Sequence, residues 1–167
     1  MSVILYSIIL LELSLVTIGD LRKRKIPNYW SLLNFISYSA FIFLFPEDIV
    51  FSWWVIGGSF LFLIVGFILF LGKIMGGGDA KFLSSIFLLI PLSVRGIYLD
   101  YLLYTTLIFA LFFFFRNFLY NFKDIWAYMR SFHLEGAKNF FGTKFPFAPV
   151  ILITWILIGL NLYSAIL

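Results

Sequence analysis

The stretch at residues 51–72, FSWWVIGGSFLFLIVGFILFLG, carries no charged side chain. As a helix it is long enough to cross a bilayer, which takes roughly 20 apolar residues. The whole chain shares this character, since 63% of its 167 residues are hydrophobic and only 12% are charged. A soluble domain has about 25% charged residues. Too few polar side chains remain to cover a surface in water, which excludes a soluble enzyme, a nucleic-acid reader and a disordered segment.

Five more apolar stretches flank this one. Together the six lie at residues 3–19, 29–45, 51–72, 80–94, 97–115 and 146–166. They predict an all-α, polytopic membrane protein, a six-transmembrane-helix bundle in the lipid bilayer, with residues 1–167 as a single transmembrane domain. The division between the fourth and fifth stretches, from Pro91 to Gly96, is the weakest. Residues 116–145 are predicted to be one polar loop, in which 117–133 form either an amphipathic surface helix or a plain connection.

The basic residues predict the orientation of the bundle. The loops at 20–28, 73–81 and 116–145 hold 11 of the 12 Lys and Arg residues. Because Lys and Arg collect on the cytoplasmic side, these loops are predicted to face the cytoplasm and both termini to lie outside. The first stretch lacks the basic region and the cleavage site of a signal peptide, so we expect it to be retained as a span.

Composition also limits the chemistry. The chain has no Cys and a single His, His133. These counts exclude disulfides, thiolate metal sites, a Cys nucleophile and a multi-His metal site. We expect neither a metal nor a cofactor.

Two aspartates stand at the ends of apolar stretches, on the side that the basic loops mark as cytoplasmic. Asp20 ends the first stretch and precedes the basic run 22–25, and Asp79 opens the fourth, after three glycines. Two carboxylates at close range can share one proton, because like charges resist double ionisation. One can then activate a water while the other donates a hydrogen bond to a scissile carbonyl. This is the chemistry of an aspartic peptidase, and it needs no metal, His or Cys.

The local surroundings leave the roles of the two aspartates open. Asp79 is expected at a helix N-terminus, where the helix dipole favours a charged carboxylate, and Asp20 near a helix C-terminus, where the dipole disfavours one. The basic run after Asp20 has the opposite effect, because nearby positive charges favour the charged form of its carboxylate. Such a pair titrates as a unit, so we assign neither the base nor the acid. The simpler alternatives are that Asp79 only caps a helix and that Asp20 only ends one.

The glycines and prolines near this face have two interpretations each. Three glycines before Asp79 would let a substrate strand approach it, or would merely form a turn. The segment KFPFAP at 144–149 is either a plain helix start or a kinked entrance to the site. Asn28, after Pro27, is a suitable cap for the second helix.

Three motifs together resemble the type IV prepilin peptidases, which include the archaeal preflagellin peptidases and the small Tad/Flp-type prepilin peptidases. The first is Asp20 with its basic run and Ile26-Pro27-Asn28. The second is Gly-Gly-Gly-Asp-Ala-Lys at 76–81, where 76–79 match the GxGD motif that holds the family's second aspartate. The third is Phe-Pro-Phe-Ala-Pro at 145–149.

The resemblance implies a membrane-embedded aspartic endopeptidase in the cytoplasmic membrane of a prokaryote. It would remove the short basic leader of pilin-like or archaellin-like precursors at the cytoplasmic face, with a prepilin-like protein as its partner and no nucleic acid. Asp20 and Asp79 carry over as the catalytic pair. The residues expected to shape the site are Gly76, Gly77, Gly78, Lys81, Pro27, Asn28, Pro146 and Pro149.

The larger bacterial members of this family add an N-terminal cytoplasmic segment with paired cysteines and also methylate the new N-terminus. This chain has no Cys and no room before its first span. We therefore do not expect methyltransferase activity, and the short peptidase-only branch is the better match.

Three other interpretations remain. Glu12, inside the first stretch, would suit a small carrier or channel, a third active-site carboxylate, or a hydrogen-bonded packing residue. A non-catalytic membrane subunit of a pilus or secretion machine would share the composition. Lys81 with Ser84 or Ser85 has the i,i+3 or i,i+4 spacing of a Ser–Lys peptidase.

Overall fold

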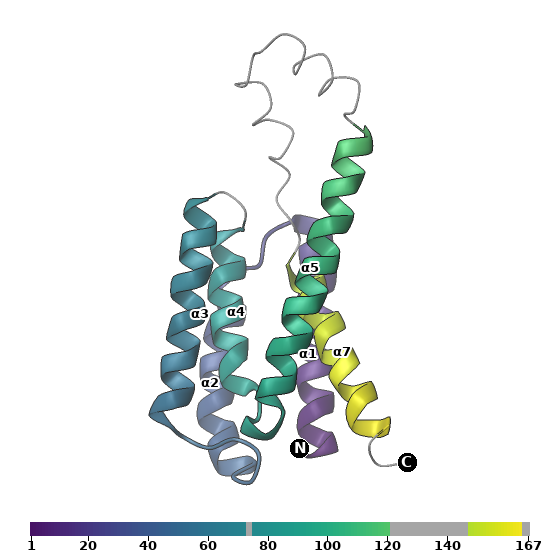
Figure 1. The fold of residues 1–167 in the computed structure, drawn as a ribbon. Coiled ribbons are helices and arrows are strands. Elements are labelled where there is room, and N and C mark those ends of the chain that lie inside the picture. Colours follow the sequence, from purple (N-terminus) through teal and green to yellow (C-terminus); the bar gives the residue numbers. More distant parts are fainter. Residues whose placement is uncertain (73–74, 121–146, 165–167) are drawn as a thin grey trace.

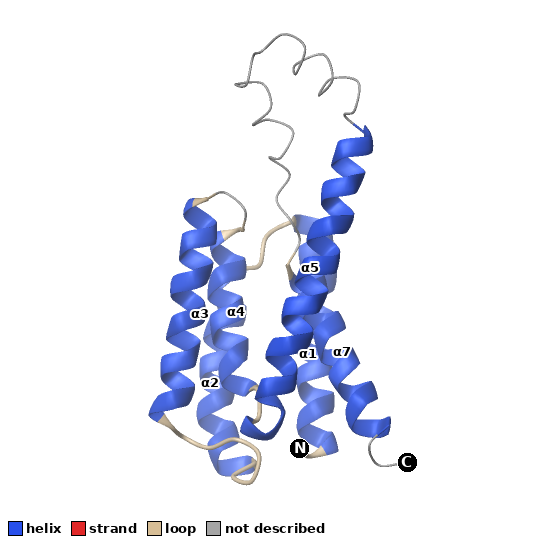
Figure 2. Ribbon diagram, viewed as in Figure 1, coloured by secondary structure: helices blue, strands red, loops and turns tan. Residues whose placement is uncertain are grey.

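The computed structural model describes residues 1–72, 75–120 and 147–164. Throughout these ranges the chain forms helices joined by loops, without a strand (Figure 2), which confirms the all-α prediction. The elements are α1 (Val3–Lys23), α2 (Asn28–Leu44), α3 (Trp53–Leu71), α4 (Gly77–Leu89), the short 3-10 helix η1 (Leu92–Val94), α5 (Arg95–Tyr120) and α7 (Ala148–Ser164).

The helices pack in two groups that stand side by side (Figure 1). In the first group, α2 and α3 pack on α4, and in the second, α1 and α5 pack on α7. The end of α1, the start of α2, the end of α3 and the start of α4 lie at one end of the bundle, and the N-terminus and the α2–α3 connection lie at the other. The end of α1 and the start of α4 therefore come to the same end from different groups.

α4 is the central helix of the first group. Almost all of its side chains are buried, with Phe82, Leu89 and Ser85 fully enclosed. It approaches α3 closely because Gly66 faces Ala80 across the contact, and a Cβ at Gly66 would meet the Cβ of Ala80 at 2.7 Å. Its 13 residues make a helix of about 20 Å, shorter than the hydrocarbon core of roughly 30 Å.

Three helical segments are long and apolar enough to cross a membrane by themselves. They are Val3–Lys23, Trp53–Leu71 and the continuous run Leu92–Tyr120. Large apolar side chains stay exposed along them, for example Leu11, Phe60 and Ile108, as expected for surfaces in contact with lipid. The remaining helices are shorter, so the count of six spans stays a prediction for α2, α4 and α7.

The helix bounds correct several predicted limits. α1 continues to Lys23 rather than ending at residue 19, so Asp20 lies inside its last turn. α5 runs to Tyr120, so the polar loop does not begin at 116. α4 ends at Leu89 because Pro91 cannot continue it, well short of residue 94.

Some predictions lie outside the described residues. These include Pro146, His133 and the amphipathic helix beyond residue 120. The single domain over residues 1–167 and the cytoplasmic orientation stay predictions. The predicted separation of charges is nevertheless visible, because the basic run 22–25 and Arg95 stand at opposite ends of the bundle.

Candidate active site

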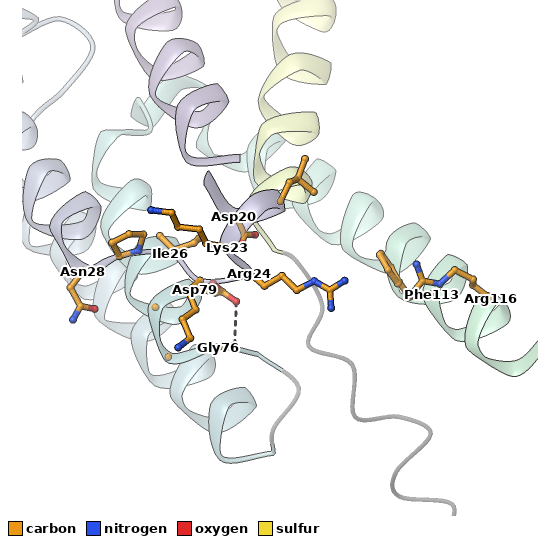
Figure 3. Close-up of a pocket in the computed structure, with 14 residues that line it drawn as sticks. Asp20, Lys23, Arg24, Ile26, Asn28, Gly76, Asp79, Phe113 and Arg116 are labelled. Atoms are coloured by element: carbon orange, nitrogen blue, oxygen red, sulfur yellow. Dashed lines mark hydrogen bonds between the residues drawn. The ribbon is translucent and has the colours of Figure 1, made fainter. Parts of the chain in front are cut away.

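A cavity of about 730 Å³ opens at the end of the bundle where α1 ends and α4 begins (Figure 3). Asp20 and Asp79 both line it. The other lining residues are Leu21, Lys23, Arg24, Lys25, Ile26, Pro27, Asn28, Gly76, Gly77, Gly78, Phe113 and Arg116. The fold thus brings to one cavity two carboxylates that are far apart in the sequence and belong to different helix groups.

Asp20 is held in the last turn of α1 by the way this helix ends. Arg24 takes the left-handed conformation, with φ of 50° and ψ of 36°, and its N–H donates to the carbonyl of Asp20 at 2.7 Å. The side chain of Asp20 is only 3% exposed. Its carboxylate accepts a backbone hydrogen bond from Ala148, the first residue of α7, while Oδ2 is buried and has no hydrogen-bond partner among the described residues.

Asp79 stands in the first turn of α4. Its Oδ2 accepts a hydrogen bond from the backbone N–H of Gly76, the N-cap residue, at 3.2 Å (Figure 3). The side chain is 8% exposed. The helix-capping interpretation of Asp79 is therefore correct, and it does not compete with a role in the cavity, because the same carboxylate both caps α4 and lines the cavity wall.

The contacts of residues 76–78 explain the spacing of the glycines before Asp79. A Cβ on Gly78 would collide with the backbone carbonyl oxygen of Ile26 in the α1–α2 linker. A Cβ on Gly76 would stand 2.9 Å from Oδ2 of Asp79. At Gly77 the nearest atom would be a ring carbon of Phe70 at 3.5 Å, an ordinary contact. The third position thus requires glycine, because backbone stands in the way. At the first position only the end of the Asp79 side chain would have to shift, and the second position has ordinary room.

These contacts change the interpretation of the glycines. The sequence left two interpretations open, a close approach of a substrate strand to Asp79 or a plain turn. In the structure the close neighbour of Gly78 is the chain's own linker, at Ile26. Gly78 therefore allows the α1–α2 linker to pack closely against α4. The linker follows Asp20, and α4 carries Asp79.

Most of the predicted site-shaping residues lie at the cavity. Pro27 and Asn28 line it together with the three glycines. Lys81 does not, because it points outward from α4 and is exposed. Pro149 is the second residue of α7 and does not line the cavity either, so the structure favours the helix-start interpretation of this proline over the kinked entrance.

The proposed Ser–Lys pairs are not formed in the structure. Ser84 donates to the carbonyl of Ser59 at 2.8 Å, and Ser85 donates to the carbonyl of Phe82 at 3.0 Å. Both serines are buried, whereas Lys81 is exposed. A serine nucleophile activated by Lys81 is therefore inconsistent with this arrangement.

Sequence reasoning missed two lining residues on α5. Phe113 falls in the apolar stretch 97–115 and was not singled out as a site residue, and Arg116 was interpreted as the start of the polar loop. Both lie on the last turns of α5, with the Arg116 guanidinium 4.5 Å from the centre of the Phe113 ring. One signal was present, since Arg116 interrupts a phenylalanine run, and a cation–aromatic pair at i,i+3 fits a continuing helix.

The structure adds one contact to the expected surroundings of Asp20. We placed it at a helix C-terminus, which disfavours a charged carboxylate. In the structure the first N–H of α7 donates to that carboxylate, so a helix N-terminus also acts on it. Both aspartates are therefore bonded to backbone N–H groups at helix starts, Gly76 for Asp79 and Ala148 for Asp20.

Among the described residues, no group of three or more His, Cys, Asp or Glu side chains is arranged to hold a metal ion. The cavity is lined by two carboxylates and by the basic side chains of Lys23, Arg24, Lys25 and Arg116. This set of donors suits paired-carboxylate chemistry.

The comparisons with known proteins agree with this site. A model of the type IV leader peptidase family matches residues 5–120, a range that includes Asp20, Asp79 and the three glycines. The chain belongs to the type IV leader peptidase family. Membership makes it a peptidase of a membrane-protease family, consistent with its apolar helices. No curated protein and no solved structure matches the chain.

Proposed function

We propose that this member of the type IV leader peptidase family is an aspartic endopeptidase that removes the short basic leader of type IV pilin-like precursors at the cytoplasmic face of the membrane. The catalytic pair is Asp20 and Asp79. The observation that carries the proposal is that these two carboxylates, from different helix groups, line one cavity together with the GxGD glycines.

The proposed reaction is direct hydrolysis. The ionised carboxylate of the pair accepts a proton from a water molecule, whose oxygen attacks the scissile carbonyl carbon. The protonated carboxylate donates a hydrogen bond to the carbonyl oxygen, where negative charge develops. The C–N bond then breaks, and the leaving nitrogen takes a proton from the pair. A free acid and a new N-terminal amine result.

The buried setting of the pair supports this chemistry. Oδ2 of Asp20 accepts no hydrogen bond from the described residues, so it can accept one from a water or a peptide group that reaches it without losing an existing bond. Both carboxylates also accept backbone N–H groups at helix starts. Because the pair titrates as a unit, we assign no fixed base or acid to either carboxyl group.

The charge of the cavity restricts how a basic leader binds. Lys23, Arg24, Lys25 and Arg116 line the same cavity as the two carboxylates, and inside it they would repel the basic residues of a leader. We therefore propose that the scissile segment alone occupies the cavity and that the leader's basic residues remain in the solvent and headgroup region. The same four cations agree with a cytoplasmic location for this end of the bundle.

Co-expression with a precursor from the same genome tests the proposal. The precursor should carry a short basic leader before a hydrophobic helix. We expect a shorter product on a gel, and mass spectrometry of its N-terminus should locate a single cut between the leader and the helix. A precursor that keeps its full mass in the presence of abundant, membrane-inserted peptidase would contradict the proposal.

A chelator should leave the activity unchanged. The two carboxylates activate water without a metal ion, so the rate of precursor cleavage in EDTA should stay within about twofold of the untreated rate. Removal of a catalytic metal would lower the rate far more. The rate is measured in detergent or vesicles after dialysis against EDTA. Loss of cleavage that zinc or another divalent ion restores would show that a metal takes part.

The carrier alternative gains no support from the surroundings of Glu12. This side chain is 7% exposed and lies against Asn34 of α2, and it does not line the cavity. A hydrogen bond between helices is the structural role expected of a polar group inside a bundle. We therefore propose no transport function.

A further inference from the structure

A polar bridge joins the two helix groups in the middle of the bundle. Asn34 of α2 lies between Glu12 of α1 and Ser85 of α4. With its amide nitrogen toward Glu12, Asn34 donates to both oxygens of that carboxyl group, Oε1 and Oε2. Its amide oxygen then lies 3.0 Å from Ser85 Oγ and shares the single hydroxyl proton of Ser85 with the Phe82 carbonyl, also at 3.0 Å. In this orientation both ends of the amide have a partner of the right kind. All three side chains are buried.

The other buried hydrogen bonds between side chains of the described residues stay inside one group. Ser59 and Ser84, 3.1 Å apart, join α3 to α4. Thr105 and Thr154, 2.7 Å apart, join α5 to α7. The Glu12–Asn34–Ser85 bridge differs because it connects α1, whose main packing is on α7, with α2 and α4.

The bridge stands on the same helices as the two aspartates. Glu12 precedes Asp20 by eight residues on α1, about 12 Å along the helix. Ser85 follows Asp79 by six residues on α4, about 9 Å. Between the bridge and the cavity, the buried hydroxyls of Thr17 and Ser31 have no hydrogen-bond partner in the part of the chain that the structure describes.

We propose that the Glu12–Asn34–Ser85 bridge is a positioning device that sets the separation of the two helix groups and so the separation of the Asp20 and Asp79 carboxylates. None of its three residues lines the cavity. The effect on cleavage rests on the proposed function, whereas the effect on the separation of the helix groups does not. Each carboxylate sits on a rigid helix, so a small shift between groups at the bridge moves one carboxylate relative to the other.

A distance measurement tests the bridge itself. Because the chain has no Cys, spin labels can be attached to cysteines introduced at Leu71 on α3 and Leu119 on α5. Both positions are exposed and lie at the cavity end of different groups. The distance distribution is recorded in lipid vesicles by pulsed electron spin resonance.

The key variant combines Glu12→Leu with Asn34→Leu. This double variant removes the carboxyl group and the amide together, so no buried carboxyl group is left unpaired. Ser85 can still donate to the Phe82 carbonyl. We therefore expect the variant to fold. The label distance should lengthen or broaden. Precursor cleavage should fall about tenfold to a hundredfold, since a misplacement of about 1 Å can cost roughly that much. Glu12→Gln keeps an acceptor for Asn34 and should behave as the original protein does.

Thr105→Val is the matched control. It removes a buried hydrogen bond within one group, and both the label distance and the cleavage rate should stay unchanged. An unchanged distance in the Leu pair, or an equal change in Thr105→Val, would overturn the bridge as the determinant of the separation. A changed distance with full cleavage would overturn the positioning of the aspartates. If the original protein cuts no precursor, the proposed function fails, and the distance measurement still decides whether the bridge joins the groups.

Discussion

Asp20→Asn and Asp79→Asn should each reduce precursor cleavage to background, a loss of about a thousandfold or more. Asparagine has nearly the same size and can accept the same hydrogen bonds, from Gly76 at position 79 and from Ala148 at position 20. It cannot take or give a proton. Because the pair acts as a unit, loss of either carboxyl group should be as damaging as loss of the other.

The measurement is the fraction of precursor shortened after co-expression, compared at equal amounts of membrane-inserted enzyme. Asp100→Asn is the matched control, because Asp100 is exposed on α5 and does not line the cavity. This variant should cut normally. Normal cleavage by either cavity variant, with a thermal midpoint equal to that of the original protein, would exclude that aspartate from the reaction.

Gly78→Ala should have the second-largest effect. The added methyl group would collide with the carbonyl oxygen of Ile26. Because this neighbour is a backbone atom, no flexible side chain can move aside to relieve the collision. We expect a loss of about 1–3 kcal/mol in the free energy of unfolding and a large loss of cleavage. The α1–α2 linker must shift, and it is continuous with the last turn of α1 that carries Asp20.

Gly77→Ala is the control one residue away, since its Cβ would meet only the Phe70 ring at 3.5 Å. It should retain both stability and cleavage. Thermal unfolding in detergent and cleavage rates are measured for both variants. Equal losses in the two would show that the glycines serve loop flexibility rather than close packing, contrary to the contacts at Gly78.

Sequence reasoning was sufficient for the parts of the site that lie on short local patterns. Asp20 with its basic run and Asp79 after its glycines stood out because charges are scarce in a chain so apolar. The charge asymmetry alone assigned both to one face. The all-helical class followed equally directly, because apolar stretches of this length can satisfy their backbone groups in a bilayer only as helices or closed barrels.

The parts that failed depend on contacts between distant segments. Nothing near Asp20 in sequence indicates that the N–H of Ala148 reaches its carboxylate. No local pattern shows that Gly78 meets Ile26. The division into two helix groups, with one aspartate on each, follows from packing that periodicity does not reveal when nearly every helix face is apolar. The length of α5 was missed because Arg116 looked like a span end.

Mixing the two inactive variants tests the central claim most directly, namely that Asp20 and Asp79 of the same chain act together in one cavity. Vesicles that contain both the Asp20→Asn and the Asp79→Asn chains are incubated with precursor, beside vesicles of the original protein. The account predicts no cleavage in the mixture, because no single chain then carries both carboxyl groups. Restored cleavage would show that the aspartates of different chains combine, and it would contradict a catalytic pair built within one cavity.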